Sequence, residues 1–174
     1  MPVLVCFSGL PGVGKTTWAK ALAAKSGALY LRIDEIEAAM RASHMACGDL
    51  ADGGYAAAQA TARAALNQGF DVVADSVNPN KLTRDAWRHA SHEHCHLDVW
   101  LTCDDRSEHR LRVEARTSDM KGAELPNWGA VEARRFEVFP EAAIHLDTGR
   151  LSVEEATVRL HAQMLAAKKE DRHV

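Results

Sequence analysis

Eight residues near the N-terminus constrain this chain more than any other stretch, because Gly9–Thr16 reads GLPGVGKT. This segment, the glycine-rich loop, matches the pattern G-x-x-x-x-G-K-[ST] at every fixed position. It follows a short apolar run at Val3–Phe7 and precedes a helical pattern at Lys15–Ser26 that Gly27 can stop. We therefore predict a strand, a turn and a helix in direct succession, which is the context in which this motif binds phosphate.

The spacing within the loop suits a backbone that wraps a polyphosphate. Its glycines permit unusual dihedral angles and let N–H groups approach the anion, and the helix start adds a positive dipole end. Lys15 can reach the β- and γ-phosphates, and the Thr16 hydroxyl can hold Mg²⁺. The alternative is a turn without a ligand, which the complete motif in its expected context disfavours. The predicted nucleotide contacts are Gly9, Pro11, Gly12, Val13, Gly14, Lys15, Thr16 and Thr17. The chain has no N-K-x-D motif to read guanine, so ATP is favoured over GTP.

Strand-like apolar runs alternate with helical patterns along the whole chain. The expected strands are Val3–Phe7, Ala28–Ile33, Phe70–Asp75, Leu97–Thr102 and Ala143–Leu146. The expected helices are Lys15–Ser26, Asp34–Ala42, Tyr55–Asn67, Asn80–His94, Asp104–Arg116, Trp128–Phe139 and Ser152–Ala167. This order predicts one α/β domain over residues 1–174, with a charged tail at 168–174. We expect a three-layer fold in which helices cover both faces of a parallel sheet of about five strands.

Composition argues against several classes of partner. The 21 basic residues do not outnumber the 24 acidic ones, whereas a nucleic-acid binder usually has a basic surplus. No apolar run approaches the length of about 20 residues that a membrane span needs. The four cysteines form no C-x-x-C pair, and we expect Cys6 and Cys103 to be buried free thiols. This usage predicts a reducing, cytoplasmic setting.

Two aspartates end expected strands, and each has two interpretations. Asp75 closes FDVVAD, where it could order Mg²⁺ in the Walker-B role or simply end the strand. Asp34 closes ALYLRID, where it could accept the proton of an attacking hydroxyl or cap the next helix. We favour the functional interpretation for Asp75, whereas the residues alone support the two interpretations of Asp34 equally. Asn78, just after Asp75, could touch an acceptor or form the turn marked by N-P-N.

Arginines crowd the helix that precedes a polar segment. Arg112 and Arg116 are four residues apart, so they share a helix face, and they stand before an expected lid at residues 116–128. Mobile arginines commonly neutralise the charge of a transferred phosphoryl group. The alternative is a solvated face that pairs with glutamates of the same helix, which we favour for Arg106 and Arg110.

Four histidines crowd a predicted helix end and the following strand start. They are His89, His92, His94 and His96. Such a tract can bind metal, but no single regular spacing gathers these side chains, so we predict a surface cluster.

Four segments follow one another along the chain: GLPGVGKTT, RIDEI, VVADSVNPN and RVEAR. Together they resemble the P-loop small-molecule kinases of the AAA_33 type, a group that includes gluconate kinase, zeta toxins and the kinase domain of phage polynucleotide kinase. The resemblance spans roughly Val3 to Leu165. It implies a P-loop NTPase fold with the loop strand central, Asp34 as the base, and Arg112 and Arg116 as lid arginines. Polynucleotide kinases carry an arginine three residues after that aspartate, where this chain has Glu37.

These observations predict an ATP- and Mg²⁺-dependent phosphotransferase that moves the γ-phosphate to a hydroxyl of a small molecule. We expect the acceptor pocket to form from Asp34–Gly54 and from the residues after Asp75. Two alternatives stay open: an ATP-binding regulator that hydrolyses ATP slowly, and a kinase of the polynucleotide or toxin type. The sequence specifies neither the acceptor nor the oligomeric state.

Overall fold

The centre of the computed structural model is a parallel five-stranded sheet in the order β2-β3-β1-β4-β5. The strands are β1 (Val3–Ser8), β2 (Leu29–Arg32), β3 (Val72–Asp75), β4 (Cys95–Thr102) and β5 (Ile144–Asp147). The structure describes residues 1–44, 48–118 and 125–170. The strand before the glycine-rich loop is central, so the predicted sheet is confirmed.

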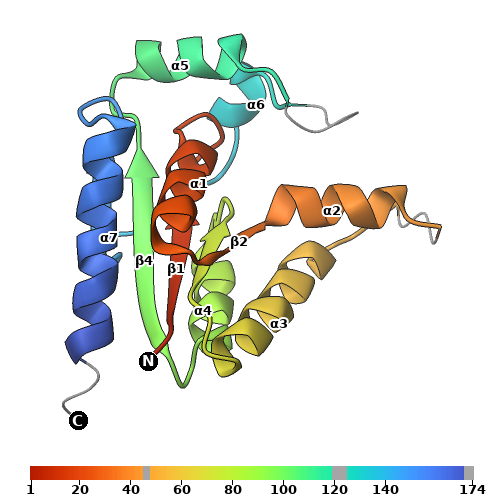
Figure 1. The fold of residues 1–174 in the computed structure, drawn as a ribbon. Coiled ribbons are helices and arrows are strands. Elements are labelled where there is room, and N and C mark those ends of the chain that lie inside the picture. The colour runs from red at the N-terminus through yellow and green to blue at the C-terminus, as the bar shows by residue number, and fades with distance from the viewer. Residues whose placement is uncertain (45–47, 119–124, 171–174) are drawn as a thin grey trace.

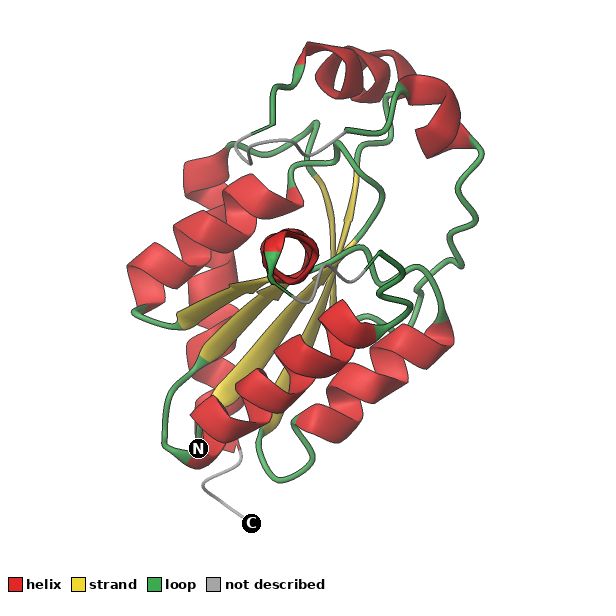
Figure 2. Ribbon diagram, turned by 90° about the vertical axis from the view of Figure 1, so that its right-hand side faces the viewer, coloured by secondary structure: helices red, strands yellow, loops and turns green. Residues whose placement is uncertain are grey.

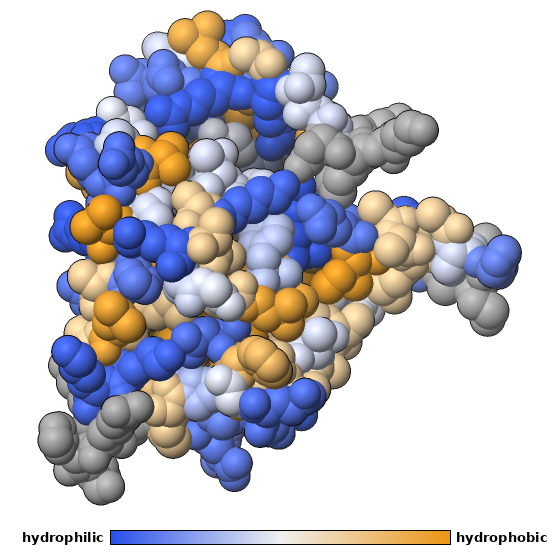
Figure 3. Space-filling model, in the orientation of Figure 1, coloured by the Kyte–Doolittle hydropathy of each residue, from blue (hydrophilic) through white to orange (hydrophobic). Residues whose placement is uncertain are grey.

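Helices cover both faces of this sheet (Figures 1 and 2). They are α1 (Lys15–Ser26), α2 (Ile33–Ala42), α3 (Gly53–Asn67), α4 (Lys81–Ala90), α5 (Arg106–Ala115), α6 (Trp128–Glu132) and α7 (Val153–Glu170). Helices α1 and α7 pack on one face, and α3 and α4 on the other. Helices α5 and α6 lie beyond the carboxyl ends of the strands, while α2 projects from the body of the molecule (Figures 1 and 3).

Strand β1 is buried on both faces, which explains its unbroken apolar sequence. Val3, Val5 and Phe7 belong to the core beneath α1 and α7, whereas Leu4 and Cys6 belong to the core beneath α3 and α4. The alternation follows from the period of two along a strand. Both cores therefore fix the strand from which the glycine-rich loop emerges.

Helix ends show where local signals suffice. Gly27 ends α1 with a φ of 72°, as predicted. Ser152 and Glu155 form a capping box at α7, in which the Glu155 amide donates to Ser152 Oγ over 3.2 Å and Ser152 N donates to Glu155 Oε2 over 3.0 Å. The predicted cap at Asp34 is wrong, because α2 begins at Ile33 with Arg32 in the cap position. The capping interpretation of Asp34 is thereby removed.

Two expected helices are shorter than predicted. The helix expected at Trp128–Phe139 ends at Glu132, and the one expected at Asn80–His94 ends at Ala90.

Cys6 and Cys103 are buried free thiols, as predicted. Among the residues that the structure describes, no helix has the length and apolar character needed to cross a membrane.

Candidate active site

The glycine-rich loop adopts a backbone that only glycine tolerates readily. Gly9, Gly12 and Gly14 have φ angles of 148°, 87° and 94°. A Cβ atom on Gly9 would lie 2.4 Å from the Leu101 carbonyl oxygen, and one on Gly12 would lie 2.4 Å from Cγ2 of Val113. Two of the three glycines are thus required by close packing as well as by dihedral angle.

Lys15 is held inside the loop rather than in solvent. Lys15 is only 8% exposed, and its Nζ donates to the carbonyl oxygen of Leu10 over 2.9 Å. Burial lowers the pKa of Lys15 to about 8, against the opposing charges of Asp75 and then Asp34. Arg116 and Arg134 lower this pKa further. The ammonium therefore lies within electrostatic reach of both predicted acids and of two arginines.

Asp75 lies at the carboxyl end of β3, directly beside the end of β1. Its register partner there is Phe7, two residues before the glycine-rich loop begins. The Tyr30 hydroxyl donates to Oδ2 of Asp75 over 2.9 Å, and Arg32 Nε lies 3.9 Å from the same oxygen. Burial, followed by the charge of Asp75, raises the pKa of Tyr30, so this hydroxyl stays protonated.

The oxygen donors near the loop suit Mg²⁺. The carboxylate of Asp75 is 4% exposed and the hydroxyl of Thr16 stands in the first turn of α1. Carboxylate and hydroxyl oxygens are hard ligands of the kind that Mg²⁺ takes in nucleotide sites. The residues present therefore fit a magnesium ion held between the loop and β3.

Asp34 stands in the first turn of α2, where this helix leaves the body of the molecule. Its side chain is 63% exposed and lies 3.7 Å from Arg32 Nε. The pKa of Tyr55 is raised mainly by burial, and the charges of Asp34 and Glu37 raise it further. Asp34 is thus an exposed carboxylate at the start of α2, within electrostatic reach of Tyr55 in α3.

The two arginines next to the expected lid diverge, because α5 ends at Ala115 and Arg116 has an extended backbone with a ψ of 143°. The prediction that they share a helix face is therefore wrong. Arg112 Nη1 donates to Thr148 Oγ1 over 2.8 Å, and Nη2 donates to the Thr148 carbonyl oxygen over 3.3 Å. Arg116, the residue directly after α5, keeps a buried Nε with no hydrogen-bond partner among the described residues. Burial lowers the pKa of Arg116, and the charge of Asp34 opposes this shift. Arg116 therefore faces the acid, whereas Arg112 anchors α5 to the loop after β5.

Arg110 forms an exposed ion pair within α5, as predicted, whereas Arg106 pairs with a glutamate of another helix and not with one of its own. Arg110 pairs with Glu114 of the same helix over 2.8 Å, and Arg106 pairs with Glu132 of α6. These contacts keep both guanidinium groups outside the site.

Sequence comparison decides the family. The sequence model described as an AAA domain, AAA_33, matches residues 4–136, which is more than half of the chain. The chain belongs to the AAA_33 family. No curated protein matches its sequence.

Solved structures share the fold of this AAA_33 domain along almost its whole length. A sugar kinase from Janibacter sp. HTCC2649 has a TM-score of 0.68 and 19% identity, with 96% of each chain covered. A gluconokinase from Sinorhizobium meliloti 1021 has a TM-score of 0.67 and 19% identity, over 99% of this chain and 98% of that one. The APS kinase of Mycobacterium tuberculosis, in complex with AMPPNP and APS, has a TM-score of 0.67 and 16% identity, over 95% and 98%. The AAA_33 domain thus has the fold of P-loop kinases.

Sequence reasoning missed several residues of the site. Tyr30 and Arg32 are two apart on β2, and their strand is the neighbour of β3, so the period of two could have placed both beside Asp75. His109 and Arg134 gave no comparable signal, because only the packing of α5 and the chain after α6 brings them close to the loop.

Two predicted segments are only partly described. Of the expected lid at 116–128, residues 119–124 lie outside the described residues, as do 171–174 of the expected tail. Residues 45–47 of the expected acceptor region also lie outside them.

Asn78 supports the fold rather than facing an acceptor. It is buried with a φ of 47°, and its Nδ2 donates to the Phe7 carbonyl oxygen and to Ser8 Oγ over 3.1 Å each. Its Oδ1 accepts from Trp87 Nε1 over 3.0 Å. The turn interpretation of N-P-N is therefore the one that the structure favours.

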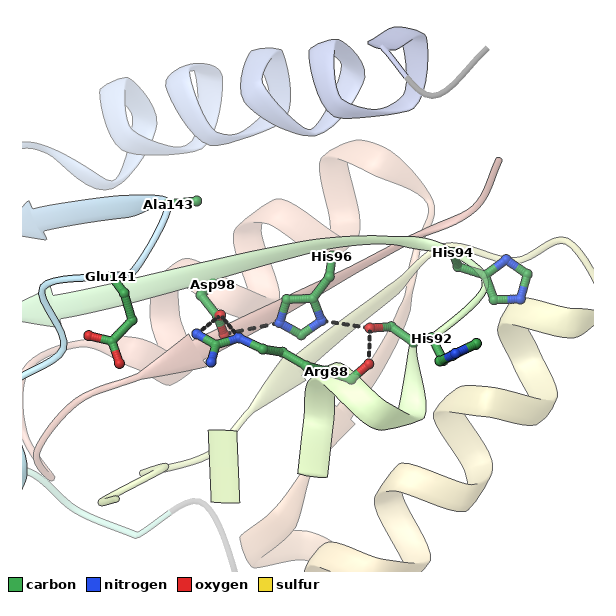
Figure 4. Close-up of a pocket in the computed structure, with 8 residues that line it drawn as sticks. Arg88, His92, His94, His96, Asp98, Glu141 and Ala143 are labelled. Atoms are coloured by element: carbon green, nitrogen blue, oxygen red, sulfur yellow. Dashed lines mark hydrogen bonds and ion pairs between the residues drawn. The ribbon is translucent and has the colours of Figure 1, made fainter. Parts of the chain in front are cut away.

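Three of the four histidines, His92, His94 and His96, line a separate cavity of about 580 Å³ (Figure 4). His96 contacts Ser91 Oγ over 2.8 Å and Asp98 Oδ1 over 3.0 Å, and Arg88 Nη2 lies 2.8 Å from Asp98. His96 pairs with Leu4, far along β1 from the glycine-rich loop. Within the described residues, no group of three or more potential ligands is arranged to hold a metal ion. This cavity is therefore distinct from the candidate active site.

Proposed function

We propose that this protein is an ATP- and Mg²⁺-dependent kinase that transfers the γ-phosphate to a hydroxyl group of a small molecule. The observation that carries the proposal is that Asp75, Asp34 and Arg116 all lie within electrostatic reach of the buried Lys15 ammonium, and that Arg116 lies within reach of Asp34. Phosphoryl transfer needs a cation for the phosphates, a ligand for the metal, an acceptor for a proton and a charge to offset the moving phosphoryl group. Each of the four residues can meet one of these needs.

Binding of the nucleotide would use the loop as it already stands. Backbone N–H groups of Gly12–Thr17 would surround the phosphates, and Lys15 would exchange the Leu10 carbonyl oxygen for phosphate oxygen. Mg²⁺, held by Thr16 and Asp75, would supply positive charge to the β- and γ-phosphate oxygens.

Transfer would take place beside the exposed carboxylate of Asp34. The acceptor oxygen forms a bond to the γ-phosphorus, the bond from that phosphorus to the bridging oxygen of ADP breaks, and the hydroxyl proton passes to the Asp34 carboxylate. Arg116, whose Nε is buried without a partner among the described residues, would donate to the oxygens of the moving phosphoryl group.

Two observations support a small acceptor over a polynucleotide. Acidic residues outnumber basic ones, and Glu37 occupies a position close to Gly54 and Tyr55 at the expected acceptor side. A phosphate backbone would meet repulsion from a carboxylate there.

Structures with this fold include proteins described as a sugar kinase and a gluconokinase, which act on small hydroxylated compounds by name.

The test is a phosphorylation screen with ATP and Mg²⁺. Sugars, sugar acids, nucleosides, hydroxylated antibiotics and short oligonucleotides are each incubated with the protein, and mass spectrometry detects products heavier by one phosphoryl group. We expect one small-molecule class to be phosphorylated and to accelerate ADP formation. Exclusive labelling of oligonucleotides would replace the small acceptor by a polynucleotide. Slow release of inorganic phosphate that responds to no acceptor would favour the ATPase regulator and contradict the proposal.

A further inference from the structure

Two side chains of strand β2, those of Tyr30 and Arg32, lie against the carboxylate of Asp75. In the parallel register of β2 and β3, Arg32 is the partner of Asp75 and Tyr30 is the partner of Val73. Because Tyr30 and Arg32 are two residues apart on a strand, their side chains project to the same side of the sheet. Both then reach Asp75, the residue that ends β3.

Both contacts converge on one oxygen atom. The Tyr30 hydroxyl donates to Oδ2 over 2.9 Å, and Arg32 Nε lies 3.9 Å from Oδ2. Neither of these two contacts uses Oδ1. A carboxylate that is held through one oxygen presents the other in a fixed direction, which is how hydrogen-bonded neighbours orient metal ligands.

The tyrosine is itself held in place. Its ring packs against the core beneath α1, and Lys20 of α1 lies over the ring, with Nζ 5.9 Å from the centroid. A rigid support of this kind limits the rotation of the carboxylate that it contacts.

We propose that Tyr30 is a positioning residue that orients the Asp75 carboxylate toward the divalent cation of the nucleotide. The inference rests on the proposed function, since it takes Asp75 as the acid that holds the cation. Arg32 lies close to the same oxygen of this carboxylate and also close to Asp34, whose Oδ2 is 3.7 Å from its Nε. The consequence is a cation affinity that depends on a residue outside the phosphate-binding motif.

The test replaces Tyr30 by Phe, which removes the hydroxyl and keeps the ring. Electron paramagnetic resonance measures the binding of Mn²⁺ to the protein in the presence of a non-hydrolysable ATP analogue. We expect Tyr30→Phe to weaken Mn²⁺ binding by about 10-fold, in the range found for residues that orient metal ligands. The chain has only one other tyrosine, so Tyr55→Phe, whose hydroxyl accepts from Asn78 N, is the matched control and should leave Mn²⁺ affinity unchanged.

A double-mutant cycle separates positioning from a general effect on folding. In an Asp75→Asn background, Tyr30→Phe should cause no further loss of Mn²⁺ affinity, because its effect passes through that carboxylate. Unchanged Mn²⁺ affinity in Tyr30→Phe, or an equal loss in the Asp75→Asn background, would overturn the inference.

Failure of the proposed function gives a different result. If the wild-type protein binds the analogue and Mn²⁺ but phosphorylates no acceptor, the kinase proposal fails and the role of Tyr30 stands. If the wild-type protein binds neither the analogue nor Mn²⁺, both are overturned.

Discussion

Nε2 of His109 lies 2.9 Å from the carbonyl oxygen of Pro11, which joins α5 directly to the glycine-rich loop. A carbonyl oxygen can only accept, so Nε2 carries the proton. One helical turn later, Val113 packs against Gly12, and the ring of Trp128 meets His109 edge-on with centroids 5.3 Å apart. The helix that leads into the predicted lid, α5, therefore packs against the loop that would hold the phosphates. A movement of one would displace the other.

This contact predicts different costs for alanine at two neighbouring glycines. Gly14→Ala should lower the free energy of unfolding by about 1–3 kcal/mol through backbone strain alone, because the nearest atoms to its added Cβ are 4.0 Å away. Gly12→Ala should cost about 1–3 kcal/mol more, because its Cβ would overlap Val113. Urea unfolding of the two variants without nucleotide measures the difference.

Val113→Ala provides the control for this comparison. Combined with Gly12→Ala it should restore part of the loss, whereas combined with Gly14→Ala its effect should simply add. Additive behaviour in both pairs would show that α5 does not press on Gly12.

The lowered pKa of Lys15 predicts opposite pH trends for stability and for ATP binding. Between about pH 8 and the ordinary lysine pKa of 10.5, the unfolded state keeps the proton that the folded state has lost. Stability from this residue therefore rises over that window, since burial of the charge no longer opposes folding. ATP affinity should fall over the same window because the ammonium is lost. Calorimetric titration with ATP, and unfolding at each pH, measure the two trends.

Two variants isolate Lys15 from other titrating groups. Lys15→Met should remove both trends and abolish turnover. Lys15→Arg should bind ATP more weakly but with affinity that stays level across the window, since a guanidinium keeps its charge there. Equal pH dependence in Lys15→Met and the wild type would assign the trends to another group.

The sheet and the loop could be predicted from the sequence because their signals are local. A doubly buried strand such as Val3–Ser8 has an unbroken apolar run, and the motif after it fixes the turn and the helix. The segment after Glu132 could not be predicted in this way. Tertiary contacts override its helical pattern and keep the segment out of a helix. The Arg84 guanidinium donates to the carbonyl oxygens of Glu137 and Val138, and Phe139 is fully buried.

Parts of the candidate site show the same contrast. Strand ends could be recognised in part: Asp75 ends β3, as predicted, whereas Asp34, which the run ALYLRID places at a strand end, stands two residues after β2 in the first turn of α2. The different directions of Arg112 and Arg116 could not be predicted, because the helical pattern continues through Arg116, whereas α5 ends at Ala115. Only the position of Thr148 after β5 shows which arginine is held there.

Asp34 should separate ATP binding from phosphoryl transfer. Asp34→Asn is expected to lower kcat with the true acceptor by about 10²–10⁴-fold, the usual contribution of a general base. The dissociation constant for ATP should change little, because this exposed side chain lies outside the glycine-rich loop. Steady-state kinetics and calorimetry measure the two quantities.

Glu35 offers a matched control in the same helical turn. It is 49% exposed and lies 3.6 Å from Arg32 Nη1, so Glu35→Gln removes a similar charge from a similar place. We expect kcat within about 3-fold of the wild type, as for a surface ion pair without a role in transfer. Equal losses in the two variants would contradict the assignment of Asp34 as the base.

Arg112 and Arg116 should affect stability in opposite directions. Arg112→Ala removes two hydrogen bonds to Thr148 and the ion pair with Glu108, and should lower the free energy of unfolding by about 1–2 kcal/mol. Arg116→Met removes a partly buried cation whose Nε has no partner among the described residues, so stability should hold or rise. The same change should lower kcat by about 10²–10³-fold, since a donor to the transferred phosphoryl group is lost. Arg110→Ala, which breaks an exposed ion pair on the same helix, should alter neither quantity. A variant of Arg116 that loses stability and keeps full turnover would show that this arginine supports the fold instead of the reaction.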